Sequence, residues 1–249
     1  MKRQISSNRV KAEALRLGFS ACGLATAEAV SPQYAAAFRQ WIGEGHEAEM
    51  GYMKNHEEKR LDPRLLVEGA QTVISVALNY YPENKIPDDQ YQIAWYAYGK
   101  DYHDVMKAKL NALWDFIKQE YLSAAGEEIA QREDDLTNDP SSPNPTTSVD
   151  NTGIITKEQG RTEPHQSAPS FALSKHDSPP PIQGRVFCDT APVLERYWAQ
   201  RAGLGWIGKN TQLIIPQAGS CFFLGEIIID VEADHYDSPQ ENRCGSCTK

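Results

Sequence analysis

The sequence predicts an α+β protein built as a mixed α/β layer sandwich. Several segments have apolar residues at helical spacing, and others are continuous apolar runs rich in β-branched residues. The two kinds of segment alternate along the chain without one consistent period, which favours packed layers of helices and strands. The apolar fraction of 40% is ordinary for a globular protein, and 249 residues can bury a sizeable core.

The first half of the chain predicts three helices and one strand. Residues 6–17 have the spaced apolar positions of an amphipathic helix. A second helix is expected over residues 32–42, with Ser31 as its N-cap and proline at its first position. The run "TVISVALNYY", residues 72–81, predicts a strand buried on both faces. Helical spacing returns over residues 102–122.

The last quarter predicts three further strands and one helix. "RVFCD" (185–189), "QLIIP" (212–216) and "CFFLGEIIID" (221–230) have the composition of strands. "TAPVLERYWAQRAG" (190–203) predicts a helix that begins near its proline and stops at its final glycine.

One segment interrupts this pattern. Residues 126–183 carry ten acidic and four basic residues and are rich in Pro, Ser, Thr, Asn and Asp. Such a composition cannot bury enough apolar surface to offset the entropy of ordering, so a disordered insertion is expected. The predicted organisation is therefore one folded domain made of residues 1–125 and 184–240, the insertion 126–183, and a separate carboxyl-terminal stretch, 241–249.

Composition also bounds the location and partners. No apolar run is long enough for a transmembrane helix, and no apolar segment follows the charged first residues as in a signal peptide, so a cytoplasmic protein is expected. Five cysteines, an odd number, indicate reduced thiols or metal ligands rather than a disulfide framework. The net charge of −9 argues against nucleic acid, but much of it comes from the insertion and does not describe the rest of the surface.

Cys244 and Cys247 form a Cys-x-x-Cys pair in "CGSCTK". In the bacterial ferredoxin pattern a third cysteine would come directly after Lys249, which suggests the start of an iron–sulfur site. A zinc knuckle and a coincidental pair are the two alternatives that spacing alone leaves open.

The glycine-rich stretch "GLGWIGKN", residues 203–210, departs from a nucleotide-binding loop. Asn210 stands where such a loop requires Ser or Thr, and a predicted helix precedes the stretch where a strand is required. Two interpretations remain: a turn whose glycines let the backbone approach a bulky ligand, and a tight turn without a ligand.

Three polar positions are candidates for chemistry. Asp189 follows a predicted strand and precedes a predicted helix, so it could be a helix N-cap or a proton donor. Arg60, in "RLDPRLL", could bind an anionic group, or belong to a solvated loop. "YGKDYH", residues 98–103, offers aromatic rings on which a base or a planar macrocycle could stack, or a polar turn in which Asp101 caps the next helix.

Several long stretches together resemble one family, the epoxyqueuosine reductases. They are "GYMKNHEEKRLDPRLLVEGAQTVISVALNYYP", "YAYGKDYH", "VFCDTAPVLERYWAQRAGLGWIGKNT", "CFFLGEIIID" and "CGSCTK", and they occur in this order. They cover most of the chain outside residues 126–183, which makes the resemblance far more specific than any single motif. The chain departs from the family in the length of that insertion and in ending within the cluster-binding motif.

The resemblance implies a cobalamin-binding core followed by the start of a ferredoxin-like domain with [4Fe–4S] clusters. Asp189 would be the proton donor, and Cys244 and Cys247 would be cluster ligands from a set that is expected to be incomplete in these residues. The positions implied to contact the corrinoid are Arg60, Tyr98, Gly205, Trp206, Gly208, Lys209, Asn210, Leu213, Leu224 and Gly225.

The implied function is the reduction of epoxyqueuosine to queuosine in tRNA, the last step of queuosine biosynthesis. The implied partners are the tRNA anticodon loop with its modified wobble nucleoside and an electron donor of unknown identity, and no membrane. A corrinoid-binding module without catalysis and a zinc-knuckle RNA-binding protein are the alternatives.

Overall fold

The computed structural model describes residues 4–137 and 181–247. The helices are α1 (Ser7–Arg16), α2 (Pro32–Gly43), α3 (Glu57–Leu61), α4 (Tyr102–Thr137) and α5 (Glu195–Arg201), with short 3-10 helices at η1 (Gly51–Lys54), η2 (Pro63–Leu65) and η3 (Trp95–Ala97). The strands are β1 (Ala21–Thr26), β2 (Thr72–Asn79), β3 (Gly184–Phe187), β4 (Trp206–Ile207), β5 (Leu213–Ile214) and β6 (Phe222–Ile229). Residues up to 122 and from 181 form one compact unit, which holds every strand and is described below.

Four strands form an antiparallel sheet in the order β1-β2-β6-β3. The two central strands, β2 and β6, are aligned along their whole length, with Ser75 opposite Glu226 and Val76 opposite Gly225. The predicted burial of the 72–81 strand on both faces is confirmed, because its first six residues are all buried. Strands β4 and β5 form a separate two-stranded hairpin.

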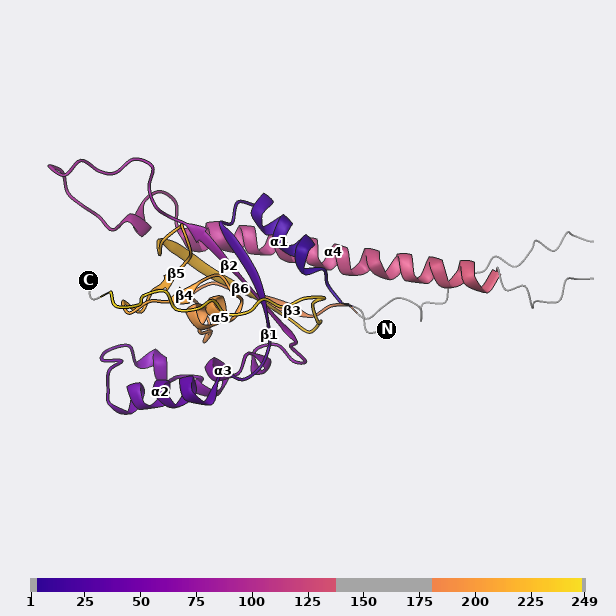
Figure 1. The fold of residues 1–249 in the computed structure, drawn as a ribbon, viewed down its shortest axis with the longest axis horizontal. Coiled ribbons are helices and arrows are strands. Elements are labelled where there is room, and N and C mark those ends of the chain that lie inside the picture. The colour runs from indigo at the N-terminus through magenta and orange to yellow at the C-terminus, as the bar shows by residue number, and fades with distance from the viewer. Residues whose placement is uncertain (1–3, 138–180, 248–249) are drawn as a thin grey trace, which may run out of the picture. The chain divides into compact units, whose positions relative to one another are not determined.

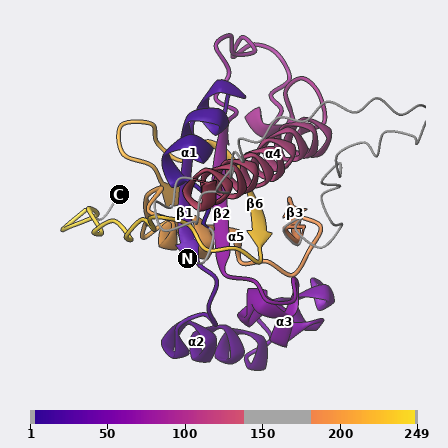
Figure 2. The ribbon, with the colours of Figure 1, turned by 90° about the vertical axis from the view of Figure 1, so that its right-hand side faces the viewer.

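Helices cover both faces of the sheet (Figures 1 and 2). On one face α1 and the beginning of α4 pack against residues such as Ile74 and Ile227. On the other face α5 and α2 pack against Val73 and Ile228, and Trp198 of α5 is almost completely buried there. The expected layer sandwich of helices and strands is therefore observed, with an antiparallel sheet at its centre.

The carboxyl-terminal segment is tied back to the sandwich by side-chain contacts. Asp237 accepts hydrogen bonds from the Leu24 backbone at 2.9 Å and from the Lys11 ammonium at 2.6 Å. Farther along, the Gln240 amide donates to the Gly203 carbonyl at 2.8 Å. Through these contacts the carboxyl-terminal segment runs from the outer strand β1 to the side of the β4–β5 hairpin.

Most predicted elements are found, and the differences have local causes. Ser31 caps α2 as expected, accepting a hydrogen bond from the Tyr34 backbone at 3.3 Å. Helix α5 begins five residues later than the expected helix over residues 190–203, because the backbone from Asp189 to Leu194 is irregular. Strand β1 was not expected, since "ACGLAT" consists of small residues with weak strand preference.

Helix α4 reaches Thr137 and so enters the segment that was expected to be disordered from residue 126. Half of the residues in this extension, 126–137, are alanine, glutamate, glutamine or arginine, which are good helix formers. The remainder of the expected insertion, residues 138–180, lies outside the described residues. Among the helices that the structure describes, none is long and apolar enough to cross a membrane.

Candidate active site

The loop between β3 and α5 presents the Asp189 carboxyl to a cavity. Asp189 has a left-handed backbone (φ +54°), within a turn in which the Thr190 N–H donates to the Cys188 carbonyl at 2.6 Å. The Asp189 N–H donates to Glu195 Oε1 at 2.7 Å, so the first residue of α5 fixes the turn. The N-cap position of α5 is Leu194, and the interpretation of Asp189 as a helix cap is therefore wrong.

The start of α4 holds the Asp189 carboxyl from the other side. The Tyr102 hydroxyl donates a hydrogen bond to Asp189 Oδ2, and burial, followed by this hydrogen bond, raises the pKa of Tyr102. The Tyr102 ring is fixed by parallel stacking on Phe223 of β6, with the ring centroids 4.0 Å apart. His103 Nε2 lies 3.7 Å from Asp189 Oδ2, while its Nδ1 lies 2.8 Å from Asp101 Oδ1. Asp101 also accepts from the His103 backbone, which confirms the expected cap at this helix start.

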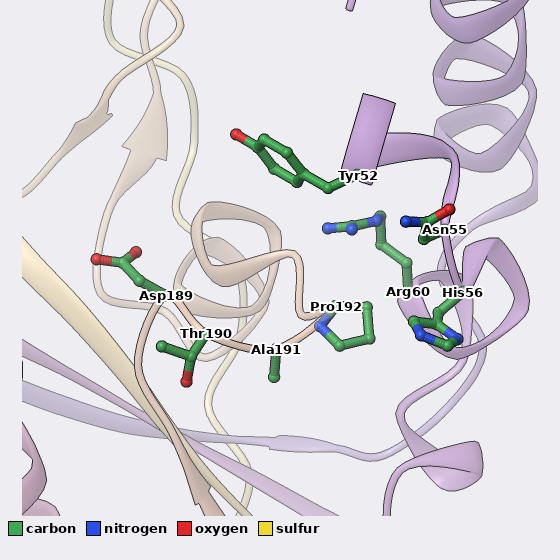
Figure 3. A pocket seen from close by; sticks show the side chains of 8 residues that line it. All are labelled: Tyr52, Asn55, His56, Arg60, Asp189, Thr190, Ala191 and Pro192. Atoms are coloured by element: carbon green, nitrogen blue, oxygen red, sulfur yellow. The ribbon is translucent and has the colours of Figure 1, made fainter. Parts of the chain in front are cut away.

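Arg60 and Asp189 both line a cavity of about 240 Å³, and in Figure 3 the Arg60 guanidinium extends toward the side of the loop that carries Asp189. The arginine comes from α3, is only 8% exposed, and has no hydrogen-bond partner for its Nε within the described residues. Burial lowers the pKa of Arg60, but the ordinary pKa of arginine lies so far above neutrality that the side chain remains charged at pH 7. A buried guanidinium nitrogen without a partner is costly, which indicates a site arranged for an anionic or polar group.

The cavity opens into a longer cleft. Two neighbouring hollows, of about 330 and 710 Å³, share the Tyr52 side chain with the first cavity and with each other. The larger hollow is walled mainly by apolar and aromatic side chains of α2, η1 and the residues next to it: Tyr34, Ala37, Phe38, Trp41, Met50, Tyr52 and Met53. Such a cleft, apolar along one wall and with a few convergent polar groups, is typical of a binding site for a large organic ligand.

Two more carboxyls lie behind Asp189. Burial, reinforced by the charge of Asp189, raises the pKa of Glu195 to about 8. Glu226, on β6, is 0% exposed and neither of its oxygens has a hydrogen-bond partner among the described residues. Its pKa is raised well above the usual range by burial and then by the charges of Glu195 and Asp189. The interior end of the site thus consists of carboxyls that favour the protonated, neutral form.

The two glycines of "GWIGKN" pack closely against another residue of the same chain, Ile214. A Cβ on Gly205 would lie 2.1 Å from the Ile214 carbonyl oxygen, and a Cβ on Gly208 would lie 2.6 Å from the Ile214 side chain. Both contacts belong to the β4–β5 hairpin, in which the Gly208 N–H donates to the Gln212 carbonyl. Of the two interpretations of this stretch, the geometry supports the tight turn for these glycines.

Replacing Gly205 by Ala is therefore expected to destabilise the protein by about 1–3 kcal/mol, because the added methyl group overlaps backbone that cannot move away easily. Gly43→Ala, at the end of α2, is the matched control, since a Cβ there meets nothing within 4 Å. Urea unfolding followed by circular dichroism measures both changes. Equal stabilities of the two variants would show that the hairpin does not require this glycine.

Lys209 joins the same hairpin to the Cys-x-x-Cys stretch. Its ammonium group donates to the Gly245 carbonyl at 2.9 Å and to the Cys247 carbonyl at 2.8 Å. A hydrogen bond from the Lys209 backbone is the main cause that lowers the pKa of the Cys244 thiol, which favours the thiolate form that binds metals. Within residues 4–137 and 181–247 no third His, Cys, Asp or Glu completes a metal-binding group.

The other expected contact residues lie at different places. Leu213 and Leu224 line a small hollow of about 50 Å³ together with Arg196. Gly225 faces away from Asp189, because a Cβ there would meet Met106 and Leu110 of α4 on the opposite face of the sheet. Asn210 accepts a hydrogen bond from the Gln212 backbone within the hairpin. The Trp206 ring lies 5.9 Å from the Arg243 guanidinium.

Tyr98 is not among the residues that line the three hollows of the cleft. Its hydroxyl accepts a hydrogen bond from the Ile86 backbone at 3.4 Å, within the loop that leads from β2 to α4. From the same "YGKDYH" motif, Tyr102 and His103 are the two side chains that reach Asp189. The aromatic and charged composition of the motif indicated a site, but the sequence did not show which tyrosine would face it.

The sequence and the fold of this chain were compared with those of known proteins. Residues 60–130 match the family model described as "Epoxyqueuosine reductase QueG, DUF1730". The chain is 37% identical over 242 residues to the epoxyqueuosine reductase of Cellulophaga algicola and 35% identical over 242 residues to that of Leadbetterella byssophila. Each match covers 97% of this chain and 60% of the relative, so the chain spans less than two thirds of their length.

Among solved structures, the fold is similar to an epoxyqueuosine reductase crystallised with an epoxyqueuosine-modified stem loop of tRNA-Tyr. The TM-score is 0.65 at 24% identity, and the match covers 97% of this chain and 49% of that one. At this identity the similarity establishes the fold.

Proposed function

Because this chain is a relative of the epoxyqueuosine reductases, we propose that it forms the catalytic core of an enzyme that reduces epoxyqueuosine to queuosine in tRNA. The observation that carries the proposal is a cleft lined by both Asp189, which is held by Tyr102 and Glu195, and Arg60, whose Nε has no partner among the described residues. Converting an epoxide to an alkene takes up two electrons and two protons and releases the oxygen as water. Such a reaction needs an acid beside the oxygen and a source of electrons.

Asp189 is the acid in this proposal. Its side chain is 42% exposed, so it can reach a substrate in the cavity, while the Tyr102 hydrogen bond restricts its orientation. A general acid must lie within hydrogen-bond reach of the atom that it protonates, and Asp189 is the carboxyl that, like Arg60, lines both the 240 Å³ and the 330 Å³ hollow. His103, 3.7 Å away, adds a second group that can stabilise the carboxylate after the proton has left.

The cleft fits the cofactor that the family resemblance implies. A cobalamin combines a broad planar ring with polar amide side chains, and the cleft combines apolar and aromatic walls with the buried Arg60, whose Nε lacks a partner in the part of the chain that the structure describes. Arg60, Tyr52 and the Ala191–Leu194 segment would contact such a group, whereas Tyr98 and Gly225 would not. When bound, the reduced corrinoid would supply the electrons, and the protein would supply position and protons.

Cys244 and Cys247 would serve as two ligands of an iron–sulfur cluster. The lowered pKa of Cys244 favours the ligating thiolate, and Lys209 holds the carbonyls of the same short segment. The β4–β5 hairpin would therefore fix the position of the electron-supplying group relative to the domain that carries Asp189.

The proposed macromolecular partner is tRNA. The solved protein with the similar fold was crystallised with a modified tRNA stem loop, and the chemistry requires the modified nucleoside to leave its stack and enter the cleft. Lysine and arginine contacts with phosphates would provide most of the affinity, so binding should weaken as salt rises. The direct test is incubation of the enzyme with cobalamin, a reductant and an epoxyqueuosine-modified stem loop, followed by mass spectrometry of the nucleosides. Loss of one oxygen atom supports the proposal, and an unchanged nucleoside overturns it.

Replacing Arg60 by Met is expected to weaken cobalamin binding by about 10- to 100-fold, the usual effect of losing a hydrogen bond from a charged group. Arg64→Met is the matched control, because Arg64 is half exposed and its guanidinium pairs with Asp62 outside the cavity. A titration followed by visible absorption measures both affinities. If the two variants bind cobalamin equally well, Arg60 does not contact the cofactor.

A further inference from the structure

We propose that Glu195 supplies protons to Asp189, so that the two carboxyls act together as one acid. The inference rests on the proposed function, because that reaction delivers two protons to the same departing oxygen. A single carboxyl carries one proton and must be recharged between the two transfers. Glu195 acts on the substrate only through Asp189, which it both positions and recharges.

The geometry places Glu195 directly against Asp189. Its Oε1 accepts the Asp189 N–H at 2.7 Å, and the carboxyl groups of the two residues also interact. Both side chains line the same cavity of about 330 Å³, which Arg60 also lines. The cavity gives Glu195 a route to solvent, and the hydrogen bond keeps its carboxyl within reach of Asp189.

The surroundings keep Glu195 protonated near neutral pH. Burial is the first cause of its raised pKa of about 8, and the charge of Asp189 is the second. Behind it, Glu226 is fully buried on β6, and burial raises its own pKa well above the usual range. A carboxylate at Glu195 would therefore face a buried neutral acid on one side and the Asp189 carboxyl on the other.

Every packed element contributes a group to this environment. On α5, the Arg196 charge lowers the pKa of Glu195, but less than burial and Asp189 raise it. From α4, Tyr102 and His103 face Asp189, and from α3 Arg60 lies across the cavity. In the turn, the Cys188 thiol has its pKa raised to about 12 by burial and so remains neutral. The nearby cations among the described residues include Arg60, Arg196, Lys107, whose charge acts on the Cys188 thiol, and, when protonated, His103. No described contact pairs either arginine with Glu195.

The proton step balances without a further reagent. Asp189 first gives its proton to the oxygen that leaves the epoxide carbon and becomes a carboxylate. The O–H bond of Glu195 then breaks, its proton forms an O–H bond on Asp189, and Glu195 becomes the carboxylate. Asp189 delivers this second proton to the same oxygen. Two protons from solvent then enter through the cavity: Glu195 passes the first to Asp189 and keeps the second, so both carboxyls return to their starting state. The electrons come from the reductive chemistry of the proposed function.

A carboxyl-selective carbon-13 NMR titration tests the proton pair without any activity measurement. The full chain should show one glutamate that titrates near pH 8. Glu195→Gln should remove this titration, and Asp189→Asn should shift it to lower pH because one cause of the raised pKa is lost. Glu28→Gln, which alters an exposed ion pair with Arg201, is the control and should leave it unchanged. If no glutamate titrates between pH 7 and 9, the inference is overturned, regardless of the measured turnover.

Kinetics then separate proton supply from simple positioning. Glu195→Gln keeps an oxygen that can accept the Asp189 N–H but has no proton to give. Turnover should fall by about 10- to 100-fold with KM unchanged, and the decline in rate above about pH 8 should disappear. Glu195→Ala should lose turnover and also raise KM. If the glutamine variant is as active as the unsubstituted enzyme, Glu195 only holds the turn and the proposal is overturned. If the NMR titration is seen but no epoxide is reduced, the proposed function fails while the proton pair stands.

Discussion

Replacing Asp189 by Asn is expected to reduce the turnover of epoxyqueuosine by about 100-fold or more, the usual contribution of a general acid. Asparagine preserves the size of the side chain and can still accept the Tyr102 hydrogen bond through its amide oxygen. It cannot transfer a proton to a departing oxygen. Cobalamin binding should be unchanged, because the variant leaves Arg60 and the apolar walls of the cleft intact. Product formation by mass spectrometry and a visible-absorption titration measure the two properties on one preparation.

Asp115→Asn is the matched control for this substitution. Asp115 is an exposed residue of α4 that pairs with Lys118 one turn away and lies outside every described cavity. Its substitution should leave both turnover and binding unchanged. An Asp189→Asn variant that turns over normally would remove Asp189 from the mechanism. A wild-type chain that binds cobalamin without any turnover would instead support the corrinoid-binding module as the function.

The sequence predicted the elements of the fold better than their assembly. Mostly apolar, β-branched runs such as residues 72–79 favour buried strands, and Ser31 with Pro32 favours a helix start at α2. The order of the sheet was beyond local patterns, because the pairing of β2 with β6 joins residues about 150 positions apart. Strand β1 could not be predicted from local patterns for a related reason. Its pairing with β2 outweighs the weak strand preference of its mostly small residues.

The site was predictable in its composition and less so in its geometry. The chemistry of Asp189 and Arg60 could be guessed from residue type and resemblance, and the fold places them across one cavity. Glu195 resembled an ordinary acidic residue in the first turn of a helix, and Glu226 resembled an interruption in an apolar strand. An acid within "FFLGEIIID" is nevertheless a signal, because a charged residue in a buried strand is costly unless it serves a purpose. Only the packing around it shows that its oxygens lack partners.

Replacing Glu226 by Gln is expected to remove a large part of the loss of stability at alkaline pH. Burial raises the pKa of Glu226, so the folded chain keeps a proton that the unfolded chain releases above about pH 4.5. While the folded state binds this additional proton, the free energy of unfolding falls by about 1.4 kcal/mol for each unit of rising pH. The stability contribution is therefore fully present at acidic pH and is lost as the pH rises toward the folded-state pKa. The isosteric amide has no proton to lose, so its curve should be flatter.

Urea unfolding at pH 5, 7 and 9 measures this dependence. The wild type and Glu226→Gln should have similar stabilities at pH 5, where both side chains are neutral and equally buried, and should diverge as the pH rises. Glu195, with its pKa raised to about 8, contributes a second slope that ends near that pH and that Glu226→Gln leaves in place. Glu57→Gln, which removes one partner of an exposed pair with Arg39, is the control and should change stability by less than about 1 kcal/mol at each pH. Parallel curves for wild type and Glu226→Gln would mean that Glu226 is already ionised in the folded protein, and that the interior of the site is not the neutral environment on which the recharging of Asp189 depends.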